Sequence, residues 1–223
     1  KNGRIWSNSS RPPHFTVDNK KYILLLPERT QRAISDAQER LASCLSPVLS
    51  YHNSAHSFAD VLPTALRLGR MKGLATQDMD ILAIAACYHD LGWIREEENH
   101  EKHSIDLAWE SLPRFGYSTS ELSLVQTLIE STKIPQQPYH SLARILADAD
   151  LGNLGRPDFW RLNAALRQER QALGHAEDEL QWWQTTYTLL TAQPYFTASA
   201  RSLWSERRQA HARAVGLYLR NIQ

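Results

Sequence analysis

Two short segments of this sequence carry imidazole and carboxylate groups at spacings that suit a metal ion. In the first, His52 and His56 are four residues apart, so on a helix both side chains would leave from one face. In the second, His89 and Asp90 end the most apolar helical stretch of the chain, and Gly92 follows closely. Burying a charged aspartate there is costly unless a cation compensates it, and adjacent side chains can converge on one ion only where a helix ends or is distorted.

A third segment places Asp148 and Asp150 two residues apart. On a helix these carboxylates diverge by about 200°, so one can face an internal site while the other faces elsewhere. Two imidazoles with two carboxylates form a borderline to hard donor set, which suits Mn, Fe, Co, Ni, Zn or Mg and leaves positions for water. Such an ion would lower the pKa of a bound water and polarise a phosphoryl oxygen, which is the chemistry of phosphate ester hydrolysis.

The elements that must position these groups are predicted to be helices. Glycine is scarce, at 9 of 223 residues, and apolar residues make up 42% of the chain, enough for a sizeable core. We predict an all-α bundle of about eight or nine helices over 27–223, preceded by an N-terminal extension or linker over 1–26. The predicted helices span 27–46, 51–71, 76–90, 99–112, 118–132, 139–154, 157–173, 176–192 and 197–221.

Local signals refine this outline at several positions. Pro63 predicts a kink or break in the second helix, and Ser118 with Glu121 forms a capping-box pattern at the start of the fifth. Thr76 is the expected N-cap of the third helix, which is apolar nearly all round and should lie at the centre of the fold. The apolar run Tyr22–Leu26 is compatible with a strand or with the edge of the core.

Charge and cysteine content exclude several classes of function. The net charge of +1 gives no electrostatic argument for a nucleic-acid partner or a membrane surface. The two cysteines cannot build a disulfide framework or a four-cysteine zinc site, and they suit a reducing cytoplasm. No apolar run approaches the roughly 20 residues that a membrane span requires. We therefore expect a cytoplasmic protein, with a homodimer as one possible assembly.

The order of these groups along the chain resembles that of the HD superfamily: His, then His-Asp, then Asp, over about residues 51–155. The better match within it is to small bacterial proteins described as predicted metal-dependent HD phosphohydrolases, which are helical. The resemblance implies that His56, His89, Asp90 and one later aspartate bind a divalent ion. Asp150 is preferred because Ala-Asp-Leu followed by an asparagine fits the end of the related motifs, while Asp148 remains a competitor.

The remaining site residues follow partly from the same resemblance and partly from their places along the chain. His52 corresponds to a proton-donor position of the cyclic-nucleotide phosphodiesterases, whose opening motif is similar to Tyr-His-Asn-x-x-His, and Glu101 is a second candidate acid lining the pocket. Lys133 and Arg156 follow helices that should reach the site, so they are expected to bind phosphate. The stretch 129–133 lacks the further histidine used by two-metal relatives, which favours one ion.

We therefore predict a metal-dependent phosphohydrolase acting on a nucleotide or other small phosphate ester through a metal-activated water. One alternative is a phosphodiesterase acting on a cyclic nucleotide or a dinucleotide. Another is a ligand-binding HD module with little turnover, although such a module has no chemical need for the full set of four ligands.

Overall fold

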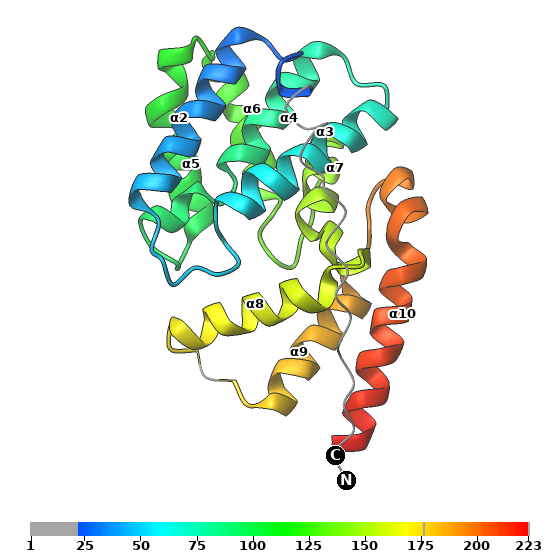
Figure 1. The fold of residues 1–223 in the computed structure, drawn as a ribbon. Helices are drawn as coiled ribbons and strands as arrows, with labels where there is room; N and C mark the ends of the chain where they lie inside the picture. The colour runs from blue at the N-terminus through cyan, green and yellow to red at the C-terminus, as the bar shows by residue number, and fades with distance from the viewer. Residues whose placement is uncertain (1–21, 176, 223) are drawn as a thin grey trace.

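The computed structural model describes residues 22–175 and 177–222, and this part of the chain contains nine α-helices and no strand. Figure 1 shows α2–α7 packed together in one layer, with α8 and α9 beneath them and α10 along one side. The α-helices are α2 (Glu28–Cys44), α3 (Leu62–Met71), α4 (Thr76–Tyr88), α5 (His100–Ser111), α6 (Thr119–Glu130), α7 (Ser141–Asp150), α8 (Phe159–Ala172), α9 (Glu179–Ala192) and α10 (Ala198–Ile222). The prediction of an all-α fold is confirmed.

Helix α4 lies at the centre of the upper layer, as its composition predicted. Every residue from Asp80 to Tyr88 is buried, and the helix packs against α2, α3 and α6. An element surrounded by other helices needs apolar side chains on all its faces, which explains the near absence of amphipathic character. Its N-cap is Ala75 and not Thr76, which is the first residue of the helix, so that detail of the prediction was wrong.

The predicted second helix is divided in the structure. Residues 51–53 form bends, Ala55–Val61 is a π-helix, and α3 begins at Leu62 with Pro63 in its first turn. A proline is tolerated in the first turn of an α-helix, although here the turn directly continues the π-helix, since Leu62 N–H bonds to Ser57 O. The expected kink or break at Pro63 is thus seen only as a change from π-helix to α-helix at Leu62, because the backbone stays helical, and the helix does not extend back to Tyr51.

Two other local predictions have clear outcomes. The capping box of α6 is present, with Ser118 and Glu121 each bonded to the backbone N–H of the other. The run Tyr22–Leu26 is a helical end followed by a turn, and Leu26 packs into the core while Leu24 and Leu25 are exposed. Residues 1–21 lie outside the described residues, so the boundary of the N-terminal extension stays a prediction.

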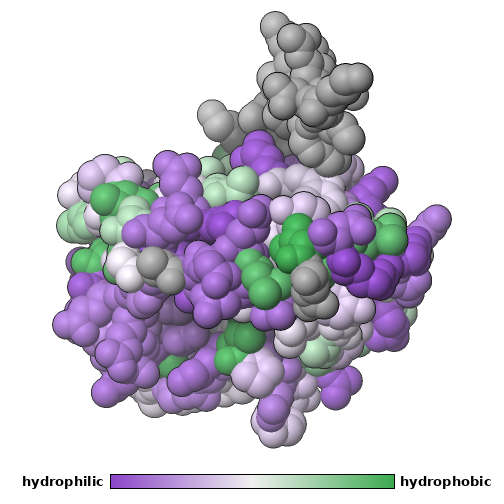
Figure 2. All heavy atoms as spheres, turned by 90° about the horizontal axis from the view of Figure 1, so that it is seen from below, coloured by the Kyte–Doolittle hydropathy of each residue, from purple (hydrophilic) through white to green (hydrophobic). Residues whose placement is uncertain are grey.

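The C-terminal layer, comprising α8, α9 and α10, has a hydrophobic cluster of its own. It includes Leu154, Phe159, Leu190 and Val215, and it is separate from the larger cluster built mainly by α2–α7. Figure 2, seen from the side of this layer, shows a mostly hydrophilic face with scattered hydrophobic residues. None of the helices in the described part of the chain combines the length and apolarity needed to cross a membrane.

A buried carboxylate ties the N-terminal helix to the central helix. Asp80 of α4 accepts hydrogen bonds from Thr30 Oγ1 at 2.5 Å, from Tyr117 OH at 2.6 Å and from Arg29 Nη2 at 2.5 Å. Arg29 also reaches Glu121 at 2.5 Å, so α2, α4 and the start of α6 share one polar network. A charge buried in this way is tolerated because every lone pair has a donor.

We expect Asp80→Ala to lower the free energy of unfolding by about 3–5 kcal/mol, because it leaves the guanidinium and two hydroxyls without their acceptor. Urea denaturation followed by circular dichroism at 222 nm measures this. The control is Arg40→Ala, which breaks the partly exposed pair with Asp36 and should cost less than about 1 kcal/mol. Equal losses in the two variants would contradict the assigned importance of the buried network.

Candidate metal centre

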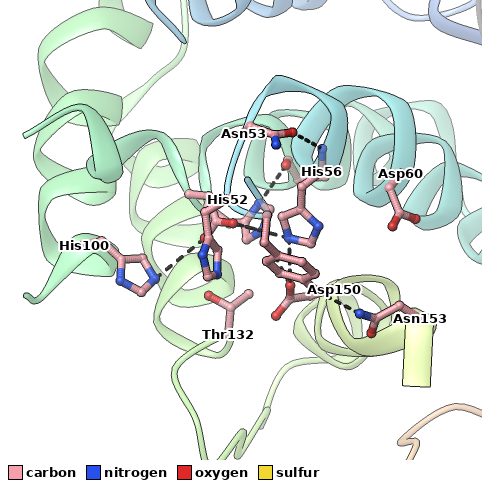
Figure 3. A network of polar contacts seen from close by, with 12 residues as sticks. His52, Asn53, His56, Asp60, His100, Thr132, Asp150 and Asn153 are labelled. Carbon is pink, nitrogen blue, oxygen red and sulfur yellow. Dashed lines mark hydrogen bonds and ion pairs between the residues drawn. The ribbon is translucent and has the colours of Figure 1, made fainter. Parts of the chain in front are cut away.

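Four side chains from three parts of the chain meet below the end of α4. His56 comes from the π-helix, His89 and Asp90 directly follow α4, and Asp150 is the last residue of α7. His56 Nε2 lies 3.3 Å from Asp90 Oδ2 and 3.4 Å from Asp150 Oδ1. His89 Nε2 lies 3.2 Å from Asp90 Oδ2 and 3.6 Å from Asp150 Oδ1. Figure 3 shows the imidazole of His56 and the carboxylate of Asp150 directed toward each other.

These separations match those between neighbouring ligands of one ion. Atoms about 2.1 Å from a metal are about 3.0 Å apart at right angles and about 3.4 Å apart at the tetrahedral angle. One ligand atom from each of His56, His89 and Asp150 can be chosen so that the three atoms lie within 4.8 Å of one another. Asp90 Oδ2 lies within 3.3 Å of both imidazoles, so the geometry supports it as a fourth ligand.

Hydrogen bonding in the cluster leaves its inner atoms without partners. His56 Nε2, His89 Nε2 and Asp90 Oδ2 are buried and form no hydrogen bond. The other ring nitrogen of His89, Nδ1, lies 2.9 Å from the carbonyl oxygen of Ala86, which it can reach only as a donor, so in the neutral imidazole Nε2 carries the lone pair. Buried polar atoms without partners are rare, and a cation between them would satisfy all three. The residues present therefore fit a divalent metal ion.

The electrostatics of the cluster also favour a positive charge at its centre. Burial alone would lower the pKa of His56, but the nearby carboxylates of Asp150 and Asp90 raise it to about 9. Burial alone would raise the pKa of Asp90, but His89 and His56 hold it well below its usual range. The carboxylates of Asp90 and Asp150 thus stay ionised, and their negative charges stabilise a cation bound between them and the two imidazoles.

The backbone after α4 explains how adjacent residues can face one point. The α-helix ends at Tyr88, and a 3₁₀-helix, Leu91–Ile94, follows directly after Asp90. Ser104 of α5 clamps this corner, since its hydroxyl donates to His89 O at 2.7 Å and accepts from Gly92 N at 2.8 Å. The expected convergence of a His-Asp pair at a helix end is therefore present.

Gly92 is required by the close approach of α5. A Cβ atom at this position would lie 1.9 Å from the backbone oxygen of His100 and 2.7 Å from the backbone nitrogen of Ser104. Neither atom belongs to a flexible side chain, so a larger residue must push α5 away from the corner that carries His89 and Asp90.

The structure distinguishes between the two aspartates of α7. Asp148 is buried away from the cluster and accepts the backbone N–H groups of Phe196 and Thr197 at 2.7 and 2.8 Å. Asp148 thereby provides an acceptor for two backbone N–H groups that directly precede α10. Asp150 points into the cluster, and its other oxygen, Oδ2, accepts from Gln136 Nε2 at 3.0 Å. The preference for Asp150 over Asp148 agrees with this geometry.

A cleft of about 1210 Å³ opens from the cluster between the upper layer and the C-terminal layer. Asp90, Asp150 and His52 line it at the site, and Lys133 and Glu101 line it farther out. Its opposite wall is largely apolar and includes Leu162, Leu166, Trp182 and Leu189. A concave, mostly apolar pocket with a few convergent polar groups is the usual form of a small-molecule site.

His52 lies beside the metal cluster without sharing a helix face with His56. It belongs to the bends before the π-helix, so the helical reason for pairing it with His56 was wrong. Its ring centroid is nevertheless 6.0 Å from that of His56. The aromatic ring of Trp93 stacks on His52 with 4.4 Å between centroids and on His100 with 4.9 Å, and the two histidine rings lie 6.1 Å from each other.

Of the other expected site residues, Glu101 and Lys133 line the cleft and Arg156 does not. Glu101 lies 3.5 Å from His100 Nε2, and His100 lies 3.7 Å from Asp90 Oδ1, so both residues border the cluster. Lys133 is exposed at the rim of the cleft. Arg156 does not line the cleft, because its guanidinium forms a two-bond ion pair with Asp60 of the π-helix.

Several residues of the site were not identified from sequence. Gln136 holds Asp150, Trp93 contacts the rings of His52 and His100, and Glu169 of α8 is buried against His52. Tyr51 lies with its ring 4.8 Å from that of His56, and its hydroxyl accepts from Asn153. Nothing in the local pattern around Glu169 or Gln136 marks them, since each acts on a group far away along the chain.

Comparisons with known proteins identify an HD domain and two solved structures of similar fold. The family model of the HD domain matches residues 55–151, which contain His56, His89, Asp90 and Asp150. YpgQ from Bacillus subtilis, crystallised in complex with ADP, has a TM-score of 0.60 and 17% identity, with 90% of this chain and 96% of that chain covered. A predicted HD superfamily hydrolase from an uncultured Thermotogales bacterium has a TM-score of 0.58 and 18% identity, covering 92% and 98%. No curated protein matches the sequence.

Divalent metal should stabilise the wild-type protein, by about 2.7 kcal/mol when the free metal is at 100 times its dissociation constant. Asp150→Asn should abolish the metal-induced rise in Tm, because it replaces a charged ligand facing the cluster. Asp148→Asn should lower Tm in the absence of metal but keep the metal-induced rise. Thermal unfolding with and without Mn²⁺, before and after EDTA, measures both, and loss of the rise in only the Asp148 variant would reverse the assignment.

Gly92→Ala should weaken metal binding by at least about tenfold, a loss typical of disturbed support around a metal site. Gly116→Ala is the control, since a Cβ atom there meets nothing within 4 Å and the residue is distant from the cluster, although its φ of +84° makes alanine strained. Metal affinity of both variants can be measured by isothermal titration calorimetry. An unchanged affinity in Gly92→Ala would show that the corner tolerates the displacement of α5.

Proposed function

Because residues 55–151 form an HD domain, we propose that this protein is a metal-dependent phosphohydrolase acting on a nucleotide or another small phosphate ester. The observation that carries the proposal is the set of three buried, unpartnered donor atoms, on His56, His89 and Asp90, at the inner end of a large cleft. A donor set arranged for a cation and open to a cleft on one side is the arrangement of a catalytic rather than a purely structural metal.

His56, His89, Asp90 and Asp150 would hold one divalent ion. When bound, the ion supplies a Lewis acid that lowers the pKa of a water molecule and withdraws charge from a phosphoryl oxygen. Two of these side chains are held by hydrogen bonds from outside the cluster, His89 by Ala86 O and Asp150 by Gln136. Fixed ligands keep the donor atoms in place before substrate arrives, which reduces the reorganisation needed during the reaction.

The cleft supplies the features that a nucleotide would require. Lys133 at the rim provides a positive charge for phosphate, whereas Arg156 is already neutralised by Asp60. The apolar wall on α8 and α9 and the ring of Trp93 offer surface for a base or another organic group. The presence of ADP in the crystals of the similar YpgQ supports a nucleotide over a simpler phosphate ester.

His52 is proposed as the proton donor to the leaving oxygen. It lines the cleft beside Asp90 and Asp150, and its ring is held against Trp93. Glu101 remains a second candidate acid, because it borders the cluster through His100. A positioned acid of this kind contributes about 10²–10⁴-fold to the rate.

We expect Mn²⁺-dependent hydrolysis of one or more nucleotides, and we expect Asp90→Asn to lower kcat/KM by at least about 100-fold through loss of a charged ligand. Phosphate release from a panel of nucleoside mono-, di- and triphosphates and cyclic nucleotides measures this. The matched control is Asp78→Asn, at the opposite end of the same helix, which should retain activity. Both variants should keep the helical circular dichroism signal.

Turnover in Asp90→Asn equal to that of the wild-type protein would contradict the metal-dependent mechanism. Hydrolysis of cyclic nucleotides alone would replace the phosphohydrolase assignment with a phosphodiesterase. Metal binding with no turnover of any substrate in the panel would favour a ligand-binding role.

A further inference from the structure

A fully buried glutamate of the C-terminal layer is bonded to His52. Glu169 of α8 has an exposed fraction of 0%. Its Oε2 accepts the backbone N–H groups of Tyr51 at 2.7 Å and His52 at 2.9 Å, and its Oε1 is hydrogen-bonded to His52 Nδ1. Three donors from one short segment therefore converge on one carboxylate, over a sequence separation of more than 100 residues.

This carboxylate has no cationic partner other than the histidine. Among the residues that the structure describes, the one ion pair formed by Glu169 is with His52, and no Lys or Arg takes part. Burial opposes its charge, but the hydrogen bond from His52 and the two backbone donors keep the pKa of Glu169 below its ordinary value. An ionised, desolvated carboxylate at Nδ1 requires a proton on that nitrogen.

The His52 ring is held from two directions. Glu169 fixes Nδ1 at one edge, and the Trp93 ring covers one face at an interplanar angle of 17°. The other nitrogen, Nε2, takes part in no hydrogen bond within the described residues, and the side chain borders the cleft next to Asp90 and Asp150. Nε2 is thus the ring atom free to face a substrate.

We propose that Glu169 is a positioning residue that keeps His52 protonated at Nδ1 and directs Nε2 to the leaving oxygen of the substrate. This inference rests on the proposed function and deepens it, because it assigns part of the catalytic machinery to the C-terminal layer, outside residues 55–151. The carboxylate fixes the Nδ1–H tautomer and the orientation of the ring in the same way that a buried aspartate does for the histidine of a hydrolase triad.

The proton balance of the step is complete without any further reagent. Water oxygen bonds to phosphorus as the bond from phosphorus to the leaving oxygen breaks, and the leaving oxygen takes that electron pair. His52 Nε2 gives its proton to the leaving oxygen, which departs as an alcohol or a phosphate. The proton lost by the attacking water returns His52 to its starting state, and Glu169 remains ionised throughout.

Glu169→Gln is the decisive variant because glutamine has nearly the same shape. Its amide oxygen can still accept from the backbone of Tyr51 and His52, but its NH₂ group must donate to Nδ1 and so forces the proton onto Nε2. The ring is then neutral and cannot give up that proton without becoming an imidazolate. The fold is retained while the hydrogen bond is reversed.

With phenyl phosphate, whose leaving group needs a proton, we expect Glu169→Gln to reduce kcat by about 10- to 100-fold. With p-nitrophenyl phosphate, whose leaving group departs as a stable anion, the loss should be less than about threefold. Glu169→Asp, which keeps the charge, should recover part of the rate. In a His52→Ala background, Glu169→Gln should cause no further loss, because the two residues act as one unit.

The control is Glu177→Gln, which removes a carboxylate that follows α8 and contacts Arg170 instead of His52. It should leave both substrates unaffected. Equal losses with the two substrates, or an additive loss in the His52→Ala background, would overturn the positioning role and leave Glu169 as a structural residue.

A spectroscopic measurement separates this inference from the proposed function. The ¹⁵N chemical shifts of the His52 ring should show a protonated Nδ1 in the wild-type protein and an unprotonated Nδ1 in Glu169→Gln. An unprotonated Nδ1 in the wild-type protein would overturn the inference even if the enzyme is active. A protonated Nδ1 in a protein that hydrolyses no phosphate ester would retain the Glu169–His52 pair and reject the proposed function.

Discussion

The placement of two carboxylates against two imidazoles, at the inner end of an otherwise apolar helix layer, is the constraint on which the site depends. Asp90 and Asp150 would be strongly unfavourable there if they faced only apolar groups. Their oxygens instead face His56 and His89 at 3.2–3.6 Å, around a point suited to a cation. Three elements hold this arrangement. Helices α4 and α7 both end beside it, and the π-helix has a wider turn at the position that carries His56.

The C-terminal layer does more than cover the bundle. Its helices form a separate hydrophobic cluster and one wall of the cleft, so they decide the size of the space in front of the candidate metal ligands. They are also joined to the site by polar contacts. Glu169 bonds to His52, and Gln193 at the end of α9 accepts from the backbone of Gln136, whose side chain holds Asp150. The C-terminal layer therefore contributes both a hydrophobic wall of the cleft and polar contacts to residues of the candidate site.

The role of each charged residue near the site depends on the groups that it contacts in the folded chain. Arg156 was expected to bind phosphate because it follows a helix that reaches the site, but it does not line the cleft and forms a two-bond pair with Asp60. Asp148 and Asp150 are separated by one residue, yet α7 turns them toward different regions, so one satisfies the backbone before α10 and the other reaches the cluster. A charge near a motif in sequence is thus not a sufficient argument for a role in the site.

Through its resemblance to the HD superfamily, the sequence named His56, His89, Asp90 and either Asp150 or Asp148 as candidate metal ligands. By itself it determined the all-α class, the central position of α4 and the capping box of α6. These depend on spacing within a single helix or on a helix end, and such patterns are written in consecutive residues. Only the tertiary structure decided the irregular start of the segment at Tyr51, the pairing of Arg156 and the burial of Glu169 against His52. Those features depend on contacts between segments about 100 residues apart, which no local periodicity encodes.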